Sequence, residues 1–257
     1  MNTQHNFSKT LSLGTSKRKA TCAIHGEYTP IIASHPHCEI CAQAAIEAHR
    51  QATVLEDFKR SEAARFAAAG IPTRYTDSGF KNYKTDQAGQ IQALSTIKNY
   101  AMAVRCGHIG SMVFTGPTGT GKTHLAVSVL KNVMARNGSS APLFAKYFTS
   151  ADLIEHVRNA WKREGDSDRA TMYRLTVEVD LLILDEYGLD DQDPKVKCHV
   201  DRVLRARYDN RKPTLLISNE TPDKLKAMLG DRVWSRLIES NENRIVKFNW
   251  ADQRGIA

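Results

Sequence analysis

The chain reads Gly116-Pro117-Thr118-Gly119-Thr120-Gly121-Lys122-Thr123 near its middle, and this stretch determines the fold that we expect. It fits the G-x-x-x-x-G-K-[ST] pattern of a phosphate-binding P-loop. The glycines let the backbone curl around phosphate groups with its N–H groups pointing inward. An apolar strand at 111–115 precedes the loop and an apolar helix follows from Lys122, as the motif requires. We therefore predict that Gly116–Thr123 binds ATP, with Lys122 on the β- and γ-phosphates and the Thr123 hydroxyl on Mg²⁺.

A pair of acids follows another apolar strand, predicted at 179–184. Asp185 at its carboxyl end is expected to hold Mg²⁺ together with Thr123. Glu186, the next residue, is expected to orient and activate the attacking water. The alternative interpretation is an acid pair that caps a neighbouring helix.

A polar residue also follows the strand predicted at 214–218. Asn219 is both a donor and an acceptor, so it can bind a γ-phosphate or the attacking water. The alternative is a turn-forming asparagine, which is common after a strand. The P-loop upstream favours the first interpretation.

Helix and strand patterns alternate from residue 91 onward, which predicts an α/β fold with a parallel sheet. Ser150 is expected to cap a helix with Leu153, Ile154, Val157 and Trp161 on one face, and Thr221 to cap another that begins with Pro222. The remaining predicted elements are a helix at 91–105 and strands at 143–148 and 244–250.

The composition limits the classes of protein that the chain can belong to. Hydrophobic residues make up 41% and charged residues 25%, which is ordinary for a globular protein. No run of 18 apolar residues occurs and the first residues are polar, so we expect a cytoplasmic protein without a membrane partner. The net charge of +8 favours nucleic acid as a partner.

The N-terminal region carries a candidate metal site, Cys22-x2-His25 followed by Cys38-x2-Cys41. Paired ligands of this type are the pattern of a structural Zn²⁺ site. His35 and His37 are rivals for the place of His25, and reduced thiols without metal are the alternative. Cys106 and Cys198 stand alone, and we interpret them as buried or incidental thiols.

The chain is expected to divide into three parts. Residues 1–20 form a disordered arm, residues 21–69 a zinc-binding module with a long partner-binding helix at 39–69, and residues 70–257 an ATPase domain. The helix is too polar to fill a core, although Leu55, Phe58 and Phe66 make a thin apolar stripe. Gly70 is expected to end it.

Two arginines lie in Gly230-Asp231-Arg232-Val233-Trp234-Ser235-Arg236. Their four-residue spacing puts Arg232 and Arg236 on one helical face. One of them could act as an arginine finger on a neighbouring subunit's nucleotide. A solvated basic face that pairs with Asp231 or Glu239 is the equal alternative.

Together with the P-loop, Asp185-Glu186 and Ser218-Asn219, this arginine box and Phe248-Asn249-Trp250 resemble the DnaC-type replicative helicase loaders. These are AAA+ ATPases related to the IstB transposition helpers. Gly70–Tyr75 and Gly79–Tyr83 are similar to the family's lead-in to the ATPase core. The resemblance implies an AAA+ parallel-sheet sandwich with a reduced C-terminal lid.

The resemblance also implies roles for particular residues. Arg236 would be the trans-acting finger with Arg232 in support, so subunits would associate through this box, and Arg254 would be a second sensor of the nucleotide. Phe80 to Tyr83 would lie near the adenine. An extra helix within 150–174 would touch single-stranded DNA, with these candidates for phosphate contact or base stacking: Arg158, Lys162, Arg163, Arg169, Trp161 and Tyr173. Burial is the alternative for Trp161, because it falls on the apolar face of its helix.

The function that this resemblance implies is ATP-dependent loading of a hexameric replicative DNA helicase onto single-stranded DNA. Two alternatives remain open. One is an IstB-like helper of DNA transposition, and the other is a zinc-containing DNA-binding regulator that nucleotide switches.

Overall fold

The computed structural model describes residues 19–29, 38–108, 110–135, 143–161, 167–188, 194–239 and 242–253. The side chains of 161, 194–197 and 242 lie outside this description. The chain divides into two compact units, Met1–Ser61 and Glu62–Ala257, and each is described by itself. Among the described helices, none has the length and apolar character needed to cross a bilayer.

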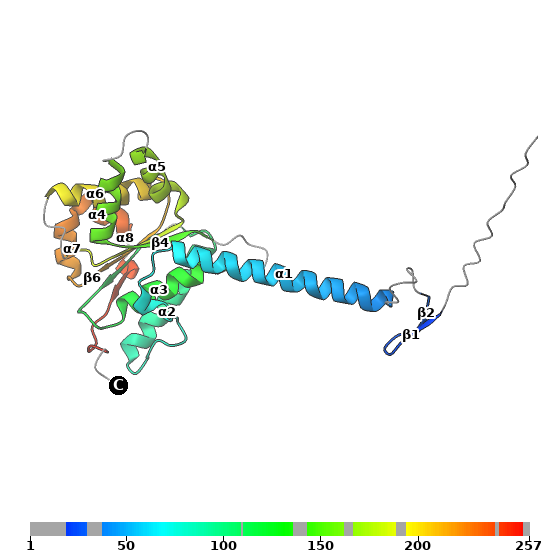
Figure 1. Cartoon of the computed structure of the whole chain (residues 1–257). Helices are drawn as coiled ribbons and strands as arrows, with labels where there is room; N and C mark the ends of the chain where they lie inside the picture. The colour runs from blue at the N-terminus through cyan, green and yellow to red at the C-terminus, as the bar shows by residue number, and fades with distance from the viewer. Residues whose placement is uncertain are drawn as a thin grey trace, which may run out of the picture. The chain divides into compact units, whose positions relative to one another are not determined.

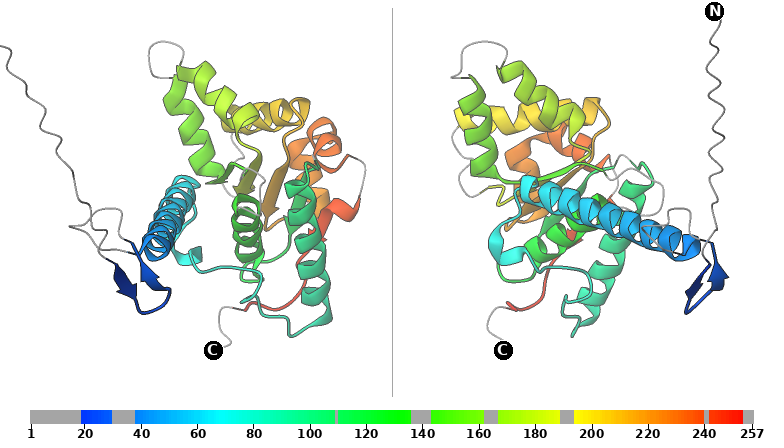
Figure 2. Two further views of the ribbon diagram at one scale, coloured as in Figure 1. Left: turned by 90° about the vertical axis from the view of Figure 1, so that its right-hand side faces the viewer. Right: turned by 45° about the vertical axis from the view of Figure 1, so that its right-hand side comes forward.

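The first unit contains a hairpin and most of a long helix. Strands β1 (Ala20–Cys22) and β2 (Gly26–Tyr28) pair antiparallel, and α1 spans Glu39–Ala68. Figure 2 shows the hairpin beside the start of α1. No residue of α1 is buried, and Leu55 of the expected apolar stripe is 52% exposed. The helix ends within one residue of its predicted boundary, whereas β1 begins at Ala20, inside the segment expected to be a disordered arm.

The second unit is built on a five-stranded parallel sheet in the order β4-β5-β6-β3-β7. Strands β4, β5 and β6 are neighbours in chain order, but β3 does not pair with β4 and lies instead between β6 and β7. The carboxyl ends of β3, β5 and β6 therefore meet at one edge, where an open α/β sheet binds its ligands. The strands span Met112–Thr115 (β3), Ala145–Thr149 (β4), Leu181–Asp185 (β5), Thr214–Ser218 (β6) and Ile245–Lys247 (β7).

Helices cover both faces of the sheet, so the predicted α/β sandwich is confirmed (Figure 1). Alternate strand residues serve the two cores: Leu181 and Ile183 join one apolar cluster, and Leu182 and Leu184 join the other. Helices α2 (Ala88–Arg105) and α3 (Lys122–Met134) pack on the first face. The other face carries α4 (Ser150–Trp161), α6 (Pro194–Asp209), α7 (Pro222–Leu229) and α8 (Asp231–Ile238). Helix α5 (Ser167–Tyr173) continues into a π-helical turn, Arg174–Glu178.

Three predicted details of the elements are wrong. Thr149, not Ser150, caps α4, because the Asp152 N–H donates to Thr149 Oγ1 at 3.1 Å. Strands β4 and β5 each start two residues later than predicted, because at their entry the Phe144 N–H donates to the Asp180 side chain at 2.9 Å instead of to a backbone carbonyl of the neighbouring strand.

The last strand is the third correction, since only Ile245–Lys247 of the predicted 244–250 is a strand. The Phe248 N–H still donates to Thr115 O at 2.7 Å, but the chain then leaves the sheet. The described residues after β7, 248–253, contain no helix, as expected for a reduced lid.

Candidate functional site

An open cleft lies at the carboxyl ends of β3, β5 and β6, with a cavity volume of about 220 Å³. It brings together Lys122, Thr123, Asp185, Glu186 and Asn219, which the sequence places in three separate segments. The cleft is lined by Arg74, Tyr75, Thr118, Gly119, Gly121, Lys122, Thr123, His124, Asp185, Glu186, Ser218, Asn219 and Gln253.

Lys122 lies folded over its own loop. Its side chain is buried, and Nζ donates to the carbonyl oxygens of Gly116 and Pro117 at 2.6 Å each. A phosphate oxygen carries negative charge and forms a stronger, charge-assisted hydrogen bond with an ammonium than a carbonyl does. The position therefore suits a lysine that exchanges loop carbonyls for phosphate oxygens when nucleotide enters.

Asp185 is buried at the end of β5 and accepts hydrogen bonds from three elements. Thr123 Oγ1 donates to Oδ2 at 2.8 Å, and the Tyr147 hydroxyl donates to the same oxygen at 2.7 Å. The Glu186 N–H donates to Oδ1 at 2.7 Å. Thr123 and Asp185 thus form the adjacent hydroxyl and carboxylate that hold Mg²⁺ in P-loop proteins.

Sequence reasoning missed Tyr147, whose side chain is buried. Burial, and next the Asp185 carboxylate, raise the pKa of Tyr147 above its ordinary value. The phenol therefore stays protonated and keeps donating throughout the physiological pH range. The alternation of side chains along β4 predicts which face of the sheet Tyr147 occupies. It does not predict that the Tyr147 hydroxyl reaches Asp185 on the neighbouring strand β5.

Glu186 and Asn219 flank the acid on the cleft side. Glu186 has a φ of +59°, a left-handed conformation that is uncommon outside glycine and often marks functional positions. The backbone around Asn219 is held by Ser218, whose Oγ donates to Tyr187 O at 2.6 Å and accepts from the Glu220 N–H at 3.1 Å. The Asn219 side chain can therefore face the cleft from a fixed backbone.

The C-terminal segment is tied to the P-loop. Trp250 Nε1 donates to Thr120 O at 2.8 Å, and the Gln253 N–H donates to Gly119 O at 2.9 Å. Gly119 has a φ of +77°, and a Cβ on it would lie 1.8 Å from the Asp252 carboxylate. The positive φ favours glycine here, because the exposed Asp252 side chain could move aside but the backbone conformation would strain any other residue. Arg254, the expected second sensor, lies outside the described residues.

Two parts of the lead-in segment lie near the P-loop, and the expected position of Phe80 to Tyr83 near the adenine stays a prediction. The Tyr83 hydroxyl donates to Thr120 O at 3.3 Å, and Phe80 packs on the core. Neither is among the residues that line the cleft, whereas Arg74 and Tyr75 are. The Arg74 guanidinium lies 4.7 Å from the Tyr75 ring centroid. No residue spacing marks Arg74 and Tyr75 in the sequence, so reasoning from motifs missed them.

The two box arginines differ in their surroundings. Arg232 is exposed, whereas Arg236 Nη1 lies 3.5 Å from Asp209 Oδ1 and its guanidinium 5.2 Å from the Tyr208 ring centroid. The alternative pairing with Asp231 or Glu239 is wrong. Those acids instead pair with other cations, namely Lys226 for Asp231 and Arg244 for Glu239.

The expected DNA-contacting segment is described only in part. Arg158 and Arg169 are exposed, and Tyr173 is 55% exposed. These side chains are available for phosphate contact and base stacking. Lys162 and Arg163 lie outside the described residues, as does the side chain of Trp161.

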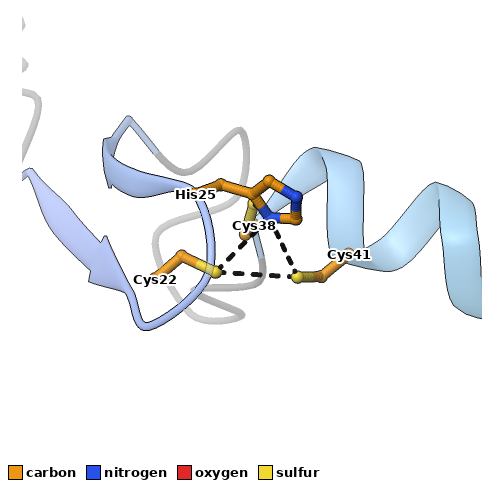
Figure 3. Close-up of side chains that lie close together, drawn as sticks. All are labelled: Cys22, His25, Cys38 and Cys41. Atoms are coloured by element: carbon orange, nitrogen blue, oxygen red, sulfur yellow. Dashed lines mark hydrogen bonds between the residues drawn. The ribbon is translucent and has the colours of Figure 1, made fainter.

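The four N-terminal ligand candidates converge in the first unit (Figure 3). Cys22 comes from the end of β1, His25 from the hairpin turn, Cys38 from just before α1 and Cys41 from its first turn. Their ligand atoms all lie within 4.8 Å of one another. His35 and His37, the rivals of His25, lie outside the described residues.

The distances fit a tetrahedral Zn²⁺ site. Bonds of about 2.3 Å to sulfur and 2.0–2.1 Å to nitrogen place tetrahedral ligand atoms roughly 3.5–3.8 Å apart. Cys22 Sγ lies 3.6 Å from Cys41 Sγ, and His25 Nδ1 lies 3.3–3.7 Å from the three sulfurs. The N–H groups of Ile24 and His25 lower the pKa of the Cys22 thiol to about 6, whereas the hydrogen bond with Cys22 raises the pKa of Cys41 to about 11, so Cys22 is the first of the two to form the thiolate that binds metal. Cys106 and Cys198 are both exposed, so burial is excluded for either.

The strand order, the P-loop and the adjacent Thr123–Asp185 pair define the chain as a P-loop ATP-binding protein of the AAA+ class. Residues 49–244 match the model of the IstB-like ATP binding proteins. The chain belongs to this IstB/DnaC family.

Two relatives named replicative helicase loader DnaC match most of the chain. The Escherichia coli (strain K12) protein is 29% identical over 189 residues, 74% of each chain. The Buchnera aphidicola (subsp. Acyrthosiphon pisum, strain APS) protein is 30% identical over 186 residues, 72% of this chain and 73% of that one.

Solved structures share the fold. The crystal structure of the DnaC helicase loader aligns with a TM-score of 0.59 at 24% identity, covering 68% of this chain and 99% of that one. The replication initiator DnaA bound to AMPPCP and single-stranded DNA aligns with a TM-score of 0.55 at 20% identity, covering 70% of this chain and 51% of that one. At these identities the likeness concerns the fold.

Proposed function

We propose that this protein is an ATPase that loads the hexameric replicative DNA helicase onto single-stranded DNA. The observation that supports this most is the extent of the relationship to named helicase loaders, about three quarters of each chain. The P-loop, the acid pair and the arginine box all fall within residues 49–244, the range that matches the family model, which supports an ATP cycle.

ATP hydrolysis is the chemistry that we assign to the cleft. Lys122 would bind the β- and γ-phosphates, and Thr123 and Asp185 would hold Mg²⁺, which neutralises charge on the transferred phosphoryl group. Glu186 would accept a proton from the attacking water, and Asn219 would orient that water or the γ-phosphate. Arg236 of a neighbouring subunit, supported by Arg232, would complete the site and make hydrolysis depend on self-association.

The N-terminal unit is the part that we assign to the partner. A structural Zn²⁺ held by Cys22, His25, Cys38 and Cys41 would link the hairpin to the start of α1, in a segment too small for its own core. The module at 21–69 would contact the helicase, and the ATPase domain at 70–257 would contact single-stranded DNA through Arg158 and Arg169. ATP and ADP would then need to favour different states of the complex.

Replacing Glu186 by Gln tests both the hydrolysis and the partner. The amide keeps the size of the side chain but cannot accept the proton, so ATP should bind and persist. We expect the Glu186→Gln protein to retain a hexameric helicase in a pull-down with ATP, and its ATP turnover to fall by at least about 100-fold.

Lys122→Ala is the matched variant, because it should abolish nucleotide binding. The Lys122→Ala protein should therefore retain no helicase in the pull-down. Lys98→Ala, an exposed lysine on α2, controls for the loss of a positive charge. Normal turnover in Glu186→Gln would contradict the role of Glu186, and absence of helicase in the ATP-trapped complex would contradict helicase loading.

A second candidate is a helper of DNA transposition, because the matching family model is that of the IstB-like proteins. This function predicts filaments on duplex DNA and a transposase in the same pull-down. Recovery of a transposase instead of a helicase would reverse the order of the two proposals.

A further inference from the structure

Tyr147 lies between the cleft and the segment that follows helix α1. Its hydroxyl donates to Asp185 Oδ2 at 2.7 Å, the same oxygen that accepts from Thr123 at 2.8 Å. Asp185 is therefore held from the P-loop side by one hydroxyl and from β4 by another. A shift of either donor changes the hydrogen bonds available to this buried carboxylate.

The backbone of Tyr147 lies on the edge strand of the sheet and contacts the chain just after α1, whose end lies beside β4 in Figure 1. Its N–H donates to Ala69 O at 2.7 Å, one residue after the helix ends. The ammonium of the neighbouring Lys146 donates to Ala68 O. Gly70 has a φ of +80°, and a Cβ on it would lie only 2.8 Å from Tyr147 O. The chain thus leaves the helix pressed against strand β4 at Tyr147.

The same segment then enters the cleft. The short helical turn Thr73–Tyr75 follows Gly70 by two residues, and its Arg74 and Tyr75 line the cleft beside the P-loop. A nucleotide in the cleft would therefore meet Arg74 and Tyr75, at the end of the 68–75 segment, and would also lie beside Asp185. Tyr147 contacts both, with its backbone on Ala69 and its side chain on Asp185.

We propose that Tyr147 is a positioning residue that couples the Mg²⁺–ATP state of Asp185 to the end of helix α1. The inference rests on the proposed ATP cycle. It adds the contacts through which nucleotide binding in the cleft would affect the end of helix α1. If Thr123 Oγ1 were to ligate Mg²⁺ instead of donating to Asp185, Tyr147 would be the remaining hydroxyl that orients Asp185. A shift of the β4 backbone at Tyr147 that accompanies this reorientation would also move the N–H that donates to Ala69 O. Coupling of this kind is reciprocal, so displacement of the helix end must change the affinity for Mg²⁺–ATP by the same factor.

Tyr147→Phe tests the coupling, because it removes the hydroxyl and keeps the ring. Tyr100→Phe is the matched control: Tyr100 is buried in the same apolar cluster, and its hydroxyl has no hydrogen-bond partner among the described residues. Affinity for a fluorescent ATP analogue would be measured with and without Mg²⁺. Hydrogen–deuterium exchange of residues 69–75 and of β4 would be followed in the same samples.

In Tyr147→Phe we expect the Mg²⁺-dependent affinity to fall by at least about ten-fold, the effect of losing roughly one hydrogen bond to a charged acceptor. Affinity without Mg²⁺ should stay at the wild-type value. The protection that Mg²⁺–ATP induces in residues 69–75 should disappear in Tyr147→Phe and persist in Tyr100→Phe. Equal behaviour of the two variants in both measurements would overturn the inference while leaving the proposed function intact.

Gly70→Ala approaches the same junction without touching Asp185. The added Cβ should push the chain away from Tyr147 O, and reciprocity then requires weaker Mg²⁺-dependent binding, with the thermal midpoint monitored to confirm folding. Unchanged affinity in a folded Gly70→Ala protein would overturn the coupling. Failure of the wild-type protein to bind Mg²⁺–ATP would instead contradict the proposed function.

Discussion

At the scale of single residues, the cleft depends on hydrogen bonds that hold each functional group from behind. Asp185 is oriented by Thr123 and Tyr147, and the loop around Gly119 and Thr120 is held by the C-terminal segment. Buried polar groups of this kind are costly when a partner is lost, because water cannot replace it. The supporting contacts should therefore affect nucleotide binding without touching the nucleotide.

Trp250→Phe is the clearest case, because it removes the Nε1 donor of Thr120 O and keeps an aromatic ring. We expect a loss of about 1–2 kcal/mol in unfolding free energy and a several-fold weaker ATP affinity. Trp234→Phe is the control, since it removes the same ring volume from the other apolar cluster. Urea unfolding and nucleotide titration would measure both effects. If the two variants lost ATP affinity equally, Trp250 would have no specific role at the P-loop.

At the scale of elements, one buried arginine joins a helix to the sheet and to the π-helical turn. Arg207 of α6 is fully buried and donates to Thr214 Oγ1 at 3.1 Å, Val179 O at 2.9 Å and Pro213 O at 2.7 Å. It also donates to Leu175 O. Burial lowers the pKa of Arg207 to about 9, so the group remains charged at neutral pH. Three carbonyl oxygens from two connections thus share one guanidinium.

Arg207→Met should lower the free energy of unfolding by roughly 3 kcal/mol, because buried carbonyl oxygens without a donor cost about 1–3 kcal/mol each. Arg205→Met, in the same helix, removes a long 3.9 Å ion pair between a half-exposed guanidinium and the largely buried Asp201, and should lower stability by less than about 1 kcal/mol. Urea denaturation distinguishes these outcomes. A loss below about 1 kcal/mol for Arg207→Met would show that water or a shifted backbone satisfies the carbonyls.

At the scale of the whole molecule, the two compact units carry separate chemistry. The metal ligands lie in Met1–Ser61, and the residues that line the cleft lie in Glu62–Ala257. Each unit has its own internal contacts. Loss of the metal should therefore disorder Met1–Ser61 while leaving nucleotide binding by the cleft of Glu62–Ala257 intact. This separation makes the zinc assignment testable in the full-length protein.

Metal analysis of the full chain should find about one zinc per molecule, and Cys38→Ser should lose it because three ligands no longer complete the tetrahedron. Limited proteolysis should then cut faster within Met1–Ser61, while ATP binding stays unchanged. Cys106→Ser, a change at an exposed thiol outside the cluster, should retain the zinc. Retention of zinc by Cys38→Ser would contradict this ligand set.

Much of the fold was predictable because its signals are local. The P-loop spacing, the apolar run before Asp185 and the Thr221-Pro222 start of α7 act over a few residues, and the structure has these elements where the sequence predicts them. Helix α1 was equally clear from its lack of glycine and proline. Errors were confined to boundaries such as Thr149 and the short β7, where a single side chain or a departure from the sheet decides the end.

The sequence by itself determined the chemistry of the site: a phosphate loop, an acid pair, a polar residue after β6 and four potential zinc ligands. Only the tertiary structure decided the partners of these groups. It placed Tyr147 on Asp185, Arg74 and Tyr75 in the cleft, and Asp209 beside Arg236. The physical reason is that local patterns set which face a residue occupies. Contacts between distant segments depend on strand order and helix packing, to which the whole core contributes.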